Sequence, residues 1–412
     1  MTSAEIRARA ASLLGLAVLF VAVSTTAQSS PAYTFKTLHK FTGGDGAEPL
    51  GGLIQDAAGN LYGTTAVRGP YSNGTVFKFD TAGRRLTVLF GFNRGGTVPA
   101  AGLVRDAEGN LYGTAANGGH CAACGMVFKI DTTGKATVLH GFKGTPDGSN
   151  PVAPLIMGTD GSLYGTTATG GNSCPPVGCG VVFKVSKTGK ETVLYRFAGT
   201  PDGWLSDAGL VLDSAGNLYG TTYYGGLNTY GTVFRLDKSG TETVLYSFQG
   251  QPDGLVPAAG LVLDESGNLF GTTEKGGTGS CFGGCGTVFM LDPSGSETVL
   301  YSFTGSPDGE YPFASLIRDA KGNLYGTTAY GGSGKCNNGN GQGCGTVFKL
   351  TQSKGGWTET VLHSFNGHSD GSYPFAPLLR DAAGNLYGTS YEGGTFLSSC
   401  TFGCGTIFRL TP

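Results

Sequence analysis

One heptad recurs seven times along this chain, and it restricts the folds that the chain can adopt. In its commonest form the heptad reads Gly-Asn-Leu-Tyr-Gly-Thr-Thr, as at Gly322–Thr328. Copies with slight variations begin at Gly59, Gly109, Gly161, Gly216, Gly267, Gly322 and Gly384. Successive copies therefore start 50 to 62 residues apart. A period of this length, with short apolar runs between glycine-rich turns, is typical of a repeat array built from β-strands.

Each repeat contains four short runs with the composition of β-strands. In the sixth repeat these runs are 311–317, 323–328, 345–350 and 359–365. Val, Ile, Thr, Tyr and Phe dominate the runs, and these residues favour the pleated conformation of a strand. Compact polar turns follow the first and the third run, and such turns close antiparallel hairpins. Each repeat therefore predicts a four-stranded antiparallel sheet.

The two ends of the repeat region complement each other. The last repeat stops after its third run, Gly405–Leu410, two residues before the sequence ends. Its missing fourth run occurs at the other end, where Phe35–Phe41 resembles Glu191–Phe197 of the third repeat. Pairing this N-terminal strand with the last repeat closes a ring and leaves no open sheet edge. We therefore predict an all-β fold, a seven-bladed β-propeller of four-stranded antiparallel blades, formed by residues 28–412 as a single domain.

The first 27 residues resemble a secretory signal peptide rather than a propeller blade. Arg7 and Arg9 precede a mostly apolar run, 10–23, and small residues follow at 24–27. The apolar run is too short to span a bilayer comfortably, which favours a cleaved signal peptide over an uncleaved N-terminal anchor. No later segment is apolar for long enough to span a membrane. We expect residues 1–27 to be removed and the protein to be secreted, periplasmic or on the cell surface.

The charge of the chain restricts its partners. The formal net charge is −2, and only 14% of the residues are charged. Nucleic acids and anionic membranes bind proteins through clustered Lys and Arg, which this near-neutral sequence does not offer. We predict neither as a partner, no cofactor and no metal site. We expect a monomer that binds an extracellular glycan or a protein.

The cysteines form a regular pattern. All ten lie between the second and third runs of their repeats, in five pairs: Cys121 and Cys124, Cys174 and Cys179, Cys281 and Cys285, Cys336 and Cys344, and Cys400 and Cys404. The first and fourth repeats lack both members. Joint presence or absence within one loop of an exported chain predicts one local disulfide in each of the five loops. The Cys121 to Cys124 spacing also occurs in redox and zinc sites, but zinc needs further ligands and only His120 is near.

Aromatic residues are the candidates for ligand binding. In an up-and-down blade, the tight turns lie on one face of the disc and the longer, variable loops on the other, where binding residues usually lie. Seven aromatic residues map to this variable face or its approaches: Trp204, Tyr223, Tyr224, Tyr311, Tyr330, Tyr373 and Tyr391. Of these, the ligand-binding candidates are Trp204, Tyr223, Tyr224, Tyr330 and Tyr391. Exposed rings there could stack on a sugar or hold a peptide. The alternative is that these rings pack between neighbouring loops.

Four motifs recur together with the heptad. They are Leu-Tyr-Gly-Thr-Thr, a glycine pair such as Gly331–Gly332, Gly-Thr-Val-Phe-Lys-Leu, and Glu-Thr-Val-Leu-Tyr-Ser-Phe. Together they resemble the motifs of the bacterial GloVer tandem-repeat proteins, also called choice-of-anchor tandem repeat proteins, over residues 35–410. The resemblance implies an exported protein with propeller-like repeats, and it brings no known activity or catalytic residue. Some members end in a surface-anchoring or sorting segment, a pattern from which this sequence departs because it ends at Pro412.

These observations rank three kinds of function. The leading hypothesis is a non-enzymatic, exported propeller that binds a ligand or partner with its disulfide-braced face, because loops can vary without disturbing the core. The alternative is an extracellular propeller enzyme, a lyase or hydrolase acting on a glycan or another secreted compound. No His-Glu-x-x-His motif is present, and we predict no catalytic residue, although several blades together can assemble a site. A purely structural envelope protein is the third possibility, with a flat and polar variable face.

Overall fold

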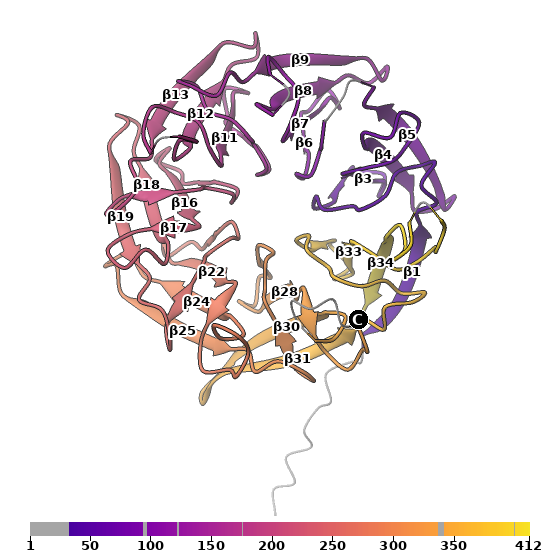
Figure 1. Cartoon of the computed structure of the whole chain (residues 1–412). Helices are drawn as coiled ribbons and strands as arrows, with labels where there is room; N and C mark the ends of the chain where they lie inside the picture. Colours follow the sequence, from indigo (N-terminus) through magenta and orange to yellow (C-terminus); the bar gives the residue numbers. More distant parts are fainter. Residues whose placement is uncertain (1–32, 94–96, 122, 175, 337–341, 399) are drawn as a thin grey trace, which may run out of the picture. The chain divides into compact units, whose positions relative to one another are not determined.

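The structure, a computed structural model, describes residues 33–412 except 94–96, 122, 175, 337–341 and 399. The described residues form β-strands and loops and no helix. Seven four-stranded antiparallel sheets stand side by side in a ring (Figure 1). The predicted all-β, seven-bladed propeller is thereby confirmed. The expected signal peptide, 1–27, lies outside the described residues.

The strands of each blade follow one another from the axis of the ring outward (Figure 1). The first three blades are β2 (Ile54–Gln55), β3 (Leu61–Thr65), β4 (Thr75–Asp80) and β5 (Arg85–Gly91); β6 (Val104–Arg105), β7 (Leu111–Ala115), β8 (Met126–Ile130) and β9 (Ala136–Gly141); and β10 (Ile156–Met157), β11 (Leu163–Thr167), β12 (Val181–Val185) and β13 (Glu191–Arg196). The fourth and fifth are β15 (Val211–Leu212), β16 (Leu218–Thr222), β18 (Thr232–Leu236) and β19 (Glu242–Ser247); and β21 (Val262–Leu263), β22 (Leu269–Thr273), β24 (Thr287–Leu291) and β25 (Glu297–Ser302). The sixth and seventh are β27 (Ile317–Arg318), β28 (Leu324–Thr328), β30 (Thr346–Ser353) and β31 (Gly356–Ser364); and β32 (Leu379–Arg380), β33 (Leu386–Ser390), β34 (Thr406–Thr411) and β1 (Thr34–Lys40).

Three short ribbons lie beside these blades, on the links that lead into the fourth, fifth and sixth. They pair β14 (Gly203–Trp204) with β17 (Tyr224–Gly225), β20 (Gly254–Leu255) with β23 (Lys275–Gly276), and β26 (Gly309–Glu310) with β29 (Tyr330–Gly331). Each ribbon joins a link to the loop that follows the second strand of the next blade. The ribbons therefore fix the variable loops of these blades to the body of the ring.

The innermost strands are shorter than the sequence predicts. In the sixth blade the expected strand 311–317 is reduced to β27, Ile317–Arg318. Pro312 has no N–H to donate to a sheet ladder. The backbone of Tyr311 is also already used, because its N–H donates to the carbonyl of Cys285 at 2.9 Å and its carbonyl accepts from the N–H of Ala329 at 3.0 Å. The backbone of the link before this inner strand is thus hydrogen-bonded to neighbouring loops and does not extend the sheet.

The N-terminal strand closes the ring, as predicted. Strand β1 is antiparallel to β34, with Phe35 opposite Leu410, and a register shift falls between Thr37 and His39. In the third blade the outermost pair, β12 and β13, shows a register shift between Val182 and Phe183, and the outermost pairs of the other blades show it too. The strand from the start of the chain therefore takes the same place in its blade as the fourth strand of the others.

The polar residues of the heptad build the turn between the first two strands. In the first blade, the Asp56 carboxylate accepts hydrogen bonds from the backbone and side-chain nitrogens of Asn60, at 2.9 and 2.8 Å. It also accepts from the hydroxyl of Tyr62 at 3.0 Å. Gly59, which opens the heptad, has a φ of 84°, in the left-handed region that glycine adopts readily. The same arrangement is repeated around Asp106, Asp213, Asp319 and Asp381.

The second half of the heptad joins each strand to its neighbours. A Cβ added to Gly63 would lie 2.7 Å from the ring of Phe77, so close packing leaves no room for a side chain. The hydroxyl of Thr64 donates to the carbonyl of Ala101 in the next blade at 2.9 Å. Equivalent bonds join every consecutive pair of blades: Thr114 to Ala153, Thr166 to Ala208, Thr221 to Ala259, Thr272 to Ala314, Thr327 to Ala376 and Thr389 to Pro49.

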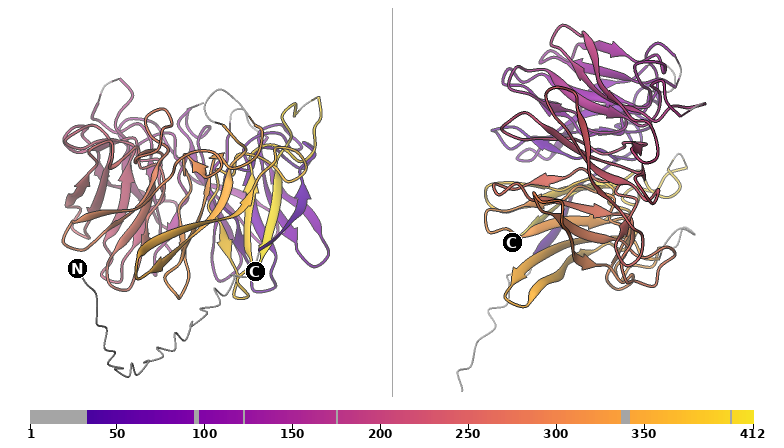
Figure 2. Two further views of the ribbon diagram at one scale, coloured as in Figure 1. Left: turned by 90° about the horizontal axis from the view of Figure 1, so that it is seen from below. Right: turned by 90° about the vertical axis from the view of Figure 1, so that its left-hand side faces the viewer.

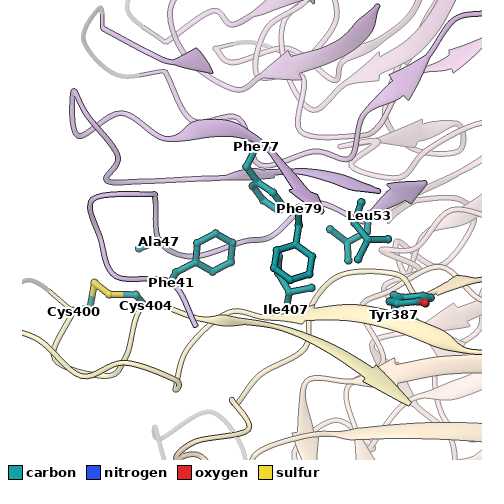
Figure 3. Close-up of a cluster of buried hydrophobic side chains, with 10 residues drawn as sticks. Phe41, Ala47, Leu53, Phe77, Phe79, Tyr387, Cys400, Cys404 and Ile407 are labelled. Carbon is teal, nitrogen blue, oxygen red and sulfur yellow. A yellow bond between two sulfur atoms is a disulfide. The ribbon is translucent and has the colours of Figure 1, made fainter. Parts of the chain in front are cut away.

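Aromatic side chains fill the space between blades. At the closure, Phe41 follows the outer strand of the seventh blade and packs edge to face on Phe77 of the first, with ring centroids 5.4 Å apart. Ile407 and Tyr387 of the seventh blade complete this cluster (Figure 3). The same phenylalanine pair occurs at the other six junctions: Phe92 and Phe128, Phe142 and Phe183, Phe197 and Phe234, Phe248 and Phe289, Phe303 and Phe348, and Phe365 and Phe408. Edge-to-face contact of buried rings stabilises each junction.

A second network runs around the outside of the ring. The hydroxyl of Tyr195 on β13 donates to Asp202 in the following link at 3.0 Å, and the N–H of Ala198 donates to the same carboxylate. Burial, together with the charge of Asp202, raises the pKa of Glu242 on the next outer strand to about 7. Two further blades repeat the Tyr–Asp bond, between Tyr246 and Asp253 and between Tyr301 and Asp308. In three blades a histidine takes the place of the tyrosine: His39 bonds to Asp45, His140 to Asp147 and His363 to Asp370.

Candidate functional site

The longer loops gather on one face of the disc, as the side view shows (Figure 2). The five predicted disulfides are present in these loops, with the predicted pairing: Cys121–Cys124, Cys174–Cys179, Cys281–Cys285, Cys336–Cys344 and Cys400–Cys404. The second cysteine of each pair is buried and lies among the core side chains between blades. Each disulfide therefore ties a surface loop directly to the core.

Apolar side chains project from the same loops. Exposed residues occur in the loops of the first, third, fourth, fifth and seventh blades: Tyr71, Val177, Leu227, Tyr230, Phe282, Phe396, Leu397 and Phe402. Phe282 is 90% exposed and lies between the two cysteines of its disulfide loop. The face is thus neither flat nor uniformly polar, unlike the face expected of a purely structural envelope protein.

Three of the five predicted aromatic candidates come together on the fourth blade. Trp204 and Tyr224 are opposite each other in the β14–β17 ribbon, and their ring centroids are 4.9 Å apart with planes inclined by 30°. Tyr223 meets Tyr224 edge to face at 4.7 Å. Tyr224 is the most exposed of the three. The ribbon therefore presents a pair of contacting, mutually tilted rings at the surface.

These rings border a groove of about 810 Å³ between the loops of the third and fourth blades. We call it the aromatic groove, and its side walls include Val177, Thr200, Trp204, Tyr224, Tyr230 and Leu255. The Cys174–Cys179 disulfide shapes one wall, because Cys174 lines the groove and Cys179 is buried in the core. Thr200 and the two tyrosines bring hydroxyl groups to an otherwise apolar surface.

The other two candidates, Tyr330 and Tyr391, lie in a separate cluster over the sixth and seventh blades. The ring of Tyr330 packs at 5.8 Å from that of Tyr311 and 5.3 Å from that of Tyr373, and it is only 6% exposed. Tyr391 packs at 5.5 Å from Phe375. The structure does not bring this pair to the aromatic groove, and the buried ring of Tyr330 offers no open surface for stacking.

Carboxylates that the sequence analysis did not single out accept hydrogen bonds from one tyrosine of each of the two clusters. The hydroxyl of Tyr391 donates to Glu48 at 3.0 Å, and the hydroxyl of Tyr223 donates to Glu274 at 2.8 Å. Burial, and secondarily the charge of Glu48, raises the pKa of Glu392 to about 7. Burial raises the pKas of both tyrosines, and so, to a lesser extent, does the charge of the carboxylate that each of them contacts. For Glu48 and Glu274 the sequence signal was available, because the equivalent positions of other repeats hold uncharged residues.

Two motifs that also occur in catalytic sites lie in the loops and links. Cys121 and Cys124 form a disulfide, so they are not a pair of free thiols, and the described residues contain no group of three or more His, Cys, Asp or Glu that could hold a metal ion. Gly367–Gly371 matches Gly-x-Ser-x-Gly, which marks a nucleophile when it joins a strand to a helix. Here it belongs to the link into the seventh blade, where Asp370 is bonded to His363 of the outer strand.

Fold and surface together define a seven-bladed β-propeller with disulfide-braced loops on one face. Within this class, the chain belongs to the Gloeobacter/Verrucomicrobia repeat family, whose sequence profile matches residues 23–176 and 283–412. This match confirms the family resemblance inferred from the heptad and its companion motifs. A comparison with curated proteins finds no match.

Solved structures share the architecture at low sequence identity. The extracellular domain of a proposed one-component system from B. thetaiotaomicron is 12% identical with a TM-score of 0.54, over 90% of this chain and 39% of that one. A proposed 6-phosphogluconolactonase from Bacteroides uniformis is 14% identical with a TM-score of 0.50, over 77% and 84% of the two chains. At these identities the likeness concerns the fold alone. No helix long and apolar enough to cross a membrane occurs in the part of the chain that the structure describes.

Proposed function

We propose that this propeller is a binding protein that holds a saccharide chain in the aromatic groove. The observation that carries the proposal is the pairing of Trp204 with Tyr224 beside a groove of about 810 Å³. Indole and phenol rings give large contact areas at low cost in side-chain entropy, and a sugar presents C–H groups on the faces of its ring. Hydroxyls on Thr200, Tyr224 and Tyr230 are positioned along the groove to exchange hydrogen bonds with sugar hydroxyls.

The geometry also favours a rigid site. The β14–β17 ribbon fixes the backbone of both rings, and the Cys174–Cys179 disulfide fixes the facing loop. A preorganised groove loses little conformational entropy when it binds, so modest contacts suffice for specific recognition. An extended ligand suits this shape because the groove runs between two blades rather than into the core.

The test uses the purified protein, residues 28–412 with its disulfides intact, on an array of glycans and cell-envelope polymers. Specific retention on one polymer class is expected, and Trp204→Ala should abolish it. Trp357→Ala is the matched control, because Trp357 is the only other tryptophan and lies on the β30–β31 hairpin away from the groove. A blank array, or retention equal in the two variants, would overturn the proposal.

Fluorescence gives a direct readout of the groove. In a Trp357→Phe protein, Trp204 is the single tryptophan, so its emission reports its own surroundings. A saccharide that stacks on the indole should change the emission intensity or wavelength in a saturable manner. A polymer that is retained on the array but leaves the emission unchanged binds elsewhere, and that result would also contradict the assignment.

We further propose that the protein is exported, with residues 1–27 removed and residues 28–412 folding as one domain. Five disulfides support this, because such bonds persist in oxidising compartments outside the cytoplasm. Expression of the full chain in a bacterium, followed by intact mass measurement, should give a protein that begins at Gln28. Recovery of a cell-associated protein that retains residues 1–27 would contradict this expectation.

A further inference from the structure

A cavity of about 270 Å³ lies on the axis of the ring, where the links of all seven blades meet. We call it the axial cavity. One position of each link contributes a side chain to its wall: Leu50, Ala100, Val152, Asp207, Ala258, Phe313 and Phe375. Since a water molecule takes about 30 Å³ in the liquid, the cavity has room on the order of nine waters or one small organic molecule. The axial cavity is separate from the aromatic groove, and its chemistry does not depend on the proposed saccharide binding.

Asp207 is the single titratable side chain among the residues that line the axial cavity. Its Oδ1 atom is inaccessible to solvent and has no hydrogen-bond partner among the residues that the structure describes. Burial alone raises the pKa of this carboxyl to about 7, because no cationic side chain compensates its charge. Tyr223 is close enough for the Asp207 charge to raise its pKa, but its hydroxyl is already bonded to Glu274.

The backbone around this carboxyl is held firmly. The hydroxyl of Ser206 donates to the carbonyl of Thr221 at 3.0 Å, and the carbonyl of Ala208 accepts from Thr166 of the preceding blade at 3.2 Å. Both neighbours of Asp207 are therefore buried and bonded, and they hold the backbone of Asp207 at the axis. A carboxylate oxygen that is buried without a hydrogen-bond partner destabilises a fold, and a ligand in the cavity would supply the partner that Oδ1 of Asp207 lacks.

The opposite side of the cavity is aromatic. Phe313 and Phe375, from the links into the sixth and seventh blades, lie edge to face with centroids 5.4 Å apart. In a ring of seven blades, the seventh lies across the axis from the fourth, which carries Asp207. Aromatic faces attract a cation through their quadrupole, and the attraction grows when the cation is removed from water. A metal ion would instead need several oxygen ligands, and the wall offers one carboxylate.

We propose that the axial cavity binds a small organic cation of the ammonium type, with Asp207 as its counter-ion and Phe313 and Phe375 as its aromatic wall. The cation supplies the charge partner that the buried carboxylate lacks, and its alkyl groups fill the apolar part of the cavity.

The test is calorimetric titration of the mature protein with choline and, as a neutral analogue of the same shape, 3,3-dimethyl-1-butanol. Choline should bind saturably with one site per chain, and the alcohol should bind at least tenfold more weakly. Asp207→Asn keeps the shape of the side chain and removes its charge, and should weaken choline at least tenfold. Phe375→Leu should weaken choline while leaving the neutral analogue unaffected.

Two further readouts separate this site from the aromatic groove and from a general effect on folding. Trp204→Ala should leave choline binding unchanged. Lowering the pH from 8 to 5 should weaken choline, because a proton then competes for the Asp207 carboxylate, whereas the Asp207→Asn protein should show no such dependence. Failure of choline to bind, or equal binding by the wild type and a folded Asp207→Asn protein, would overturn the proposal.

Discussion

The hydroxyl of Thr389 donates a hydrogen bond to the carbonyl of Pro49 at 3.1 Å, across 340 positions of sequence. Both groups are buried, and the bond joins the seventh blade to the link into the first. The first threonine of each other heptad makes the equivalent bond to the next blade, so a bond between neighbouring repeats becomes a long-range contact at the closure. The closure of this ring is thus made from the same parts as its other junctions.

Removal of this hydroxyl should weaken the closure. Thr389→Val keeps the shape of the side chain but leaves the buried Pro49 carbonyl without its donor, which should lower the free energy of unfolding by about 1–3 kcal/mol. Chemical denaturation measures the change. Thr243→Val, on the exposed side of an outer strand, is the control and should change stability little. Equal stability of Thr389→Val and the wild type would show that the bond contributes nothing to closure.

The middle glycine of the heptad should not tolerate a methyl group. In the fourth blade, a Cβ on Gly220 would lie 2.7 Å from the Phe234 ring and 2.9 Å from Leu210. Gly220→Ala should therefore overpack the junction and cost about 1–3 kcal/mol of stability. Gly44→Ala is the matched control, because no atom lies within 4 Å of its added Cβ. A melting temperature of Gly220→Ala equal to that of the control would mean that the junction is loosely packed.

The ring was predictable from sequence because short sequence motifs identify both the repeated blades and the strand that closes the ring. Phe35–Phe41 resembles the outer strands of other blades. It also pairs with β34 through a register shift like the one between β12 and β13 of the third blade, so similar sequences form the same irregular pairing. The length of the inner strands was not predictable in this way. The segment preceding Ile317 has the composition of a strand, but its backbone is taken by contacts with another blade's loop, as the bond from Tyr311 to Cys285 shows.

Burial of individual side chains on the variable face was not predictable either, because it depends on several blades at once. Tyr330 looks exposed in the sequence, but Tyr311 and Tyr373 from neighbouring links cover its ring. Asp207 looks like an ordinary loop residue. Only the convergence of all seven links on one axis places its carboxyl in an apolar cavity.

The outer ring of carboxyls should make the propeller more stable in mild acid than in alkali. Burial raises the pKas of Glu191, Glu242, Glu297 and Glu359 to about 7, and one oxygen of each is buried without a partner. A carboxyl whose pKa is higher in the folded than in the unfolded protein favours folding when it is protonated. The contribution is fully present below the unfolded pKa of about 4.5 and is lost as the pH rises through about 7.

The melting temperature should therefore fall as the pH is raised from 5 to 8. Glu242→Gln, whose amide is neutral at every pH and can donate to the neighbouring Asp202, should reduce this fall and raise the melting temperature at pH 8. Glu108→Gln, at an exposed turn, serves as the control. If Glu242→Gln melted below the wild type at pH 8, the glutamate would be stabilised as a carboxylate, and the assignment of the raised pKa would be wrong.

Individual disulfides should separate ligand binding from stability. Replacing both Cys174 and Cys179 by Ser frees the loop that forms one wall of the aromatic groove, and removing so short a crosslink should cost about 2 kcal/mol. The same double replacement at Cys121 and Cys124 should cost a similar amount, because Cys124 is also buried between blades, but that pair does not line the groove. Saccharide retention and thermal melting are measured on both proteins. Loss of retention in the first variant alone is the expected result, since its groove is no longer preorganised. Equal loss in both, or in neither, would show that the braced loop of the third blade does not form the binding site.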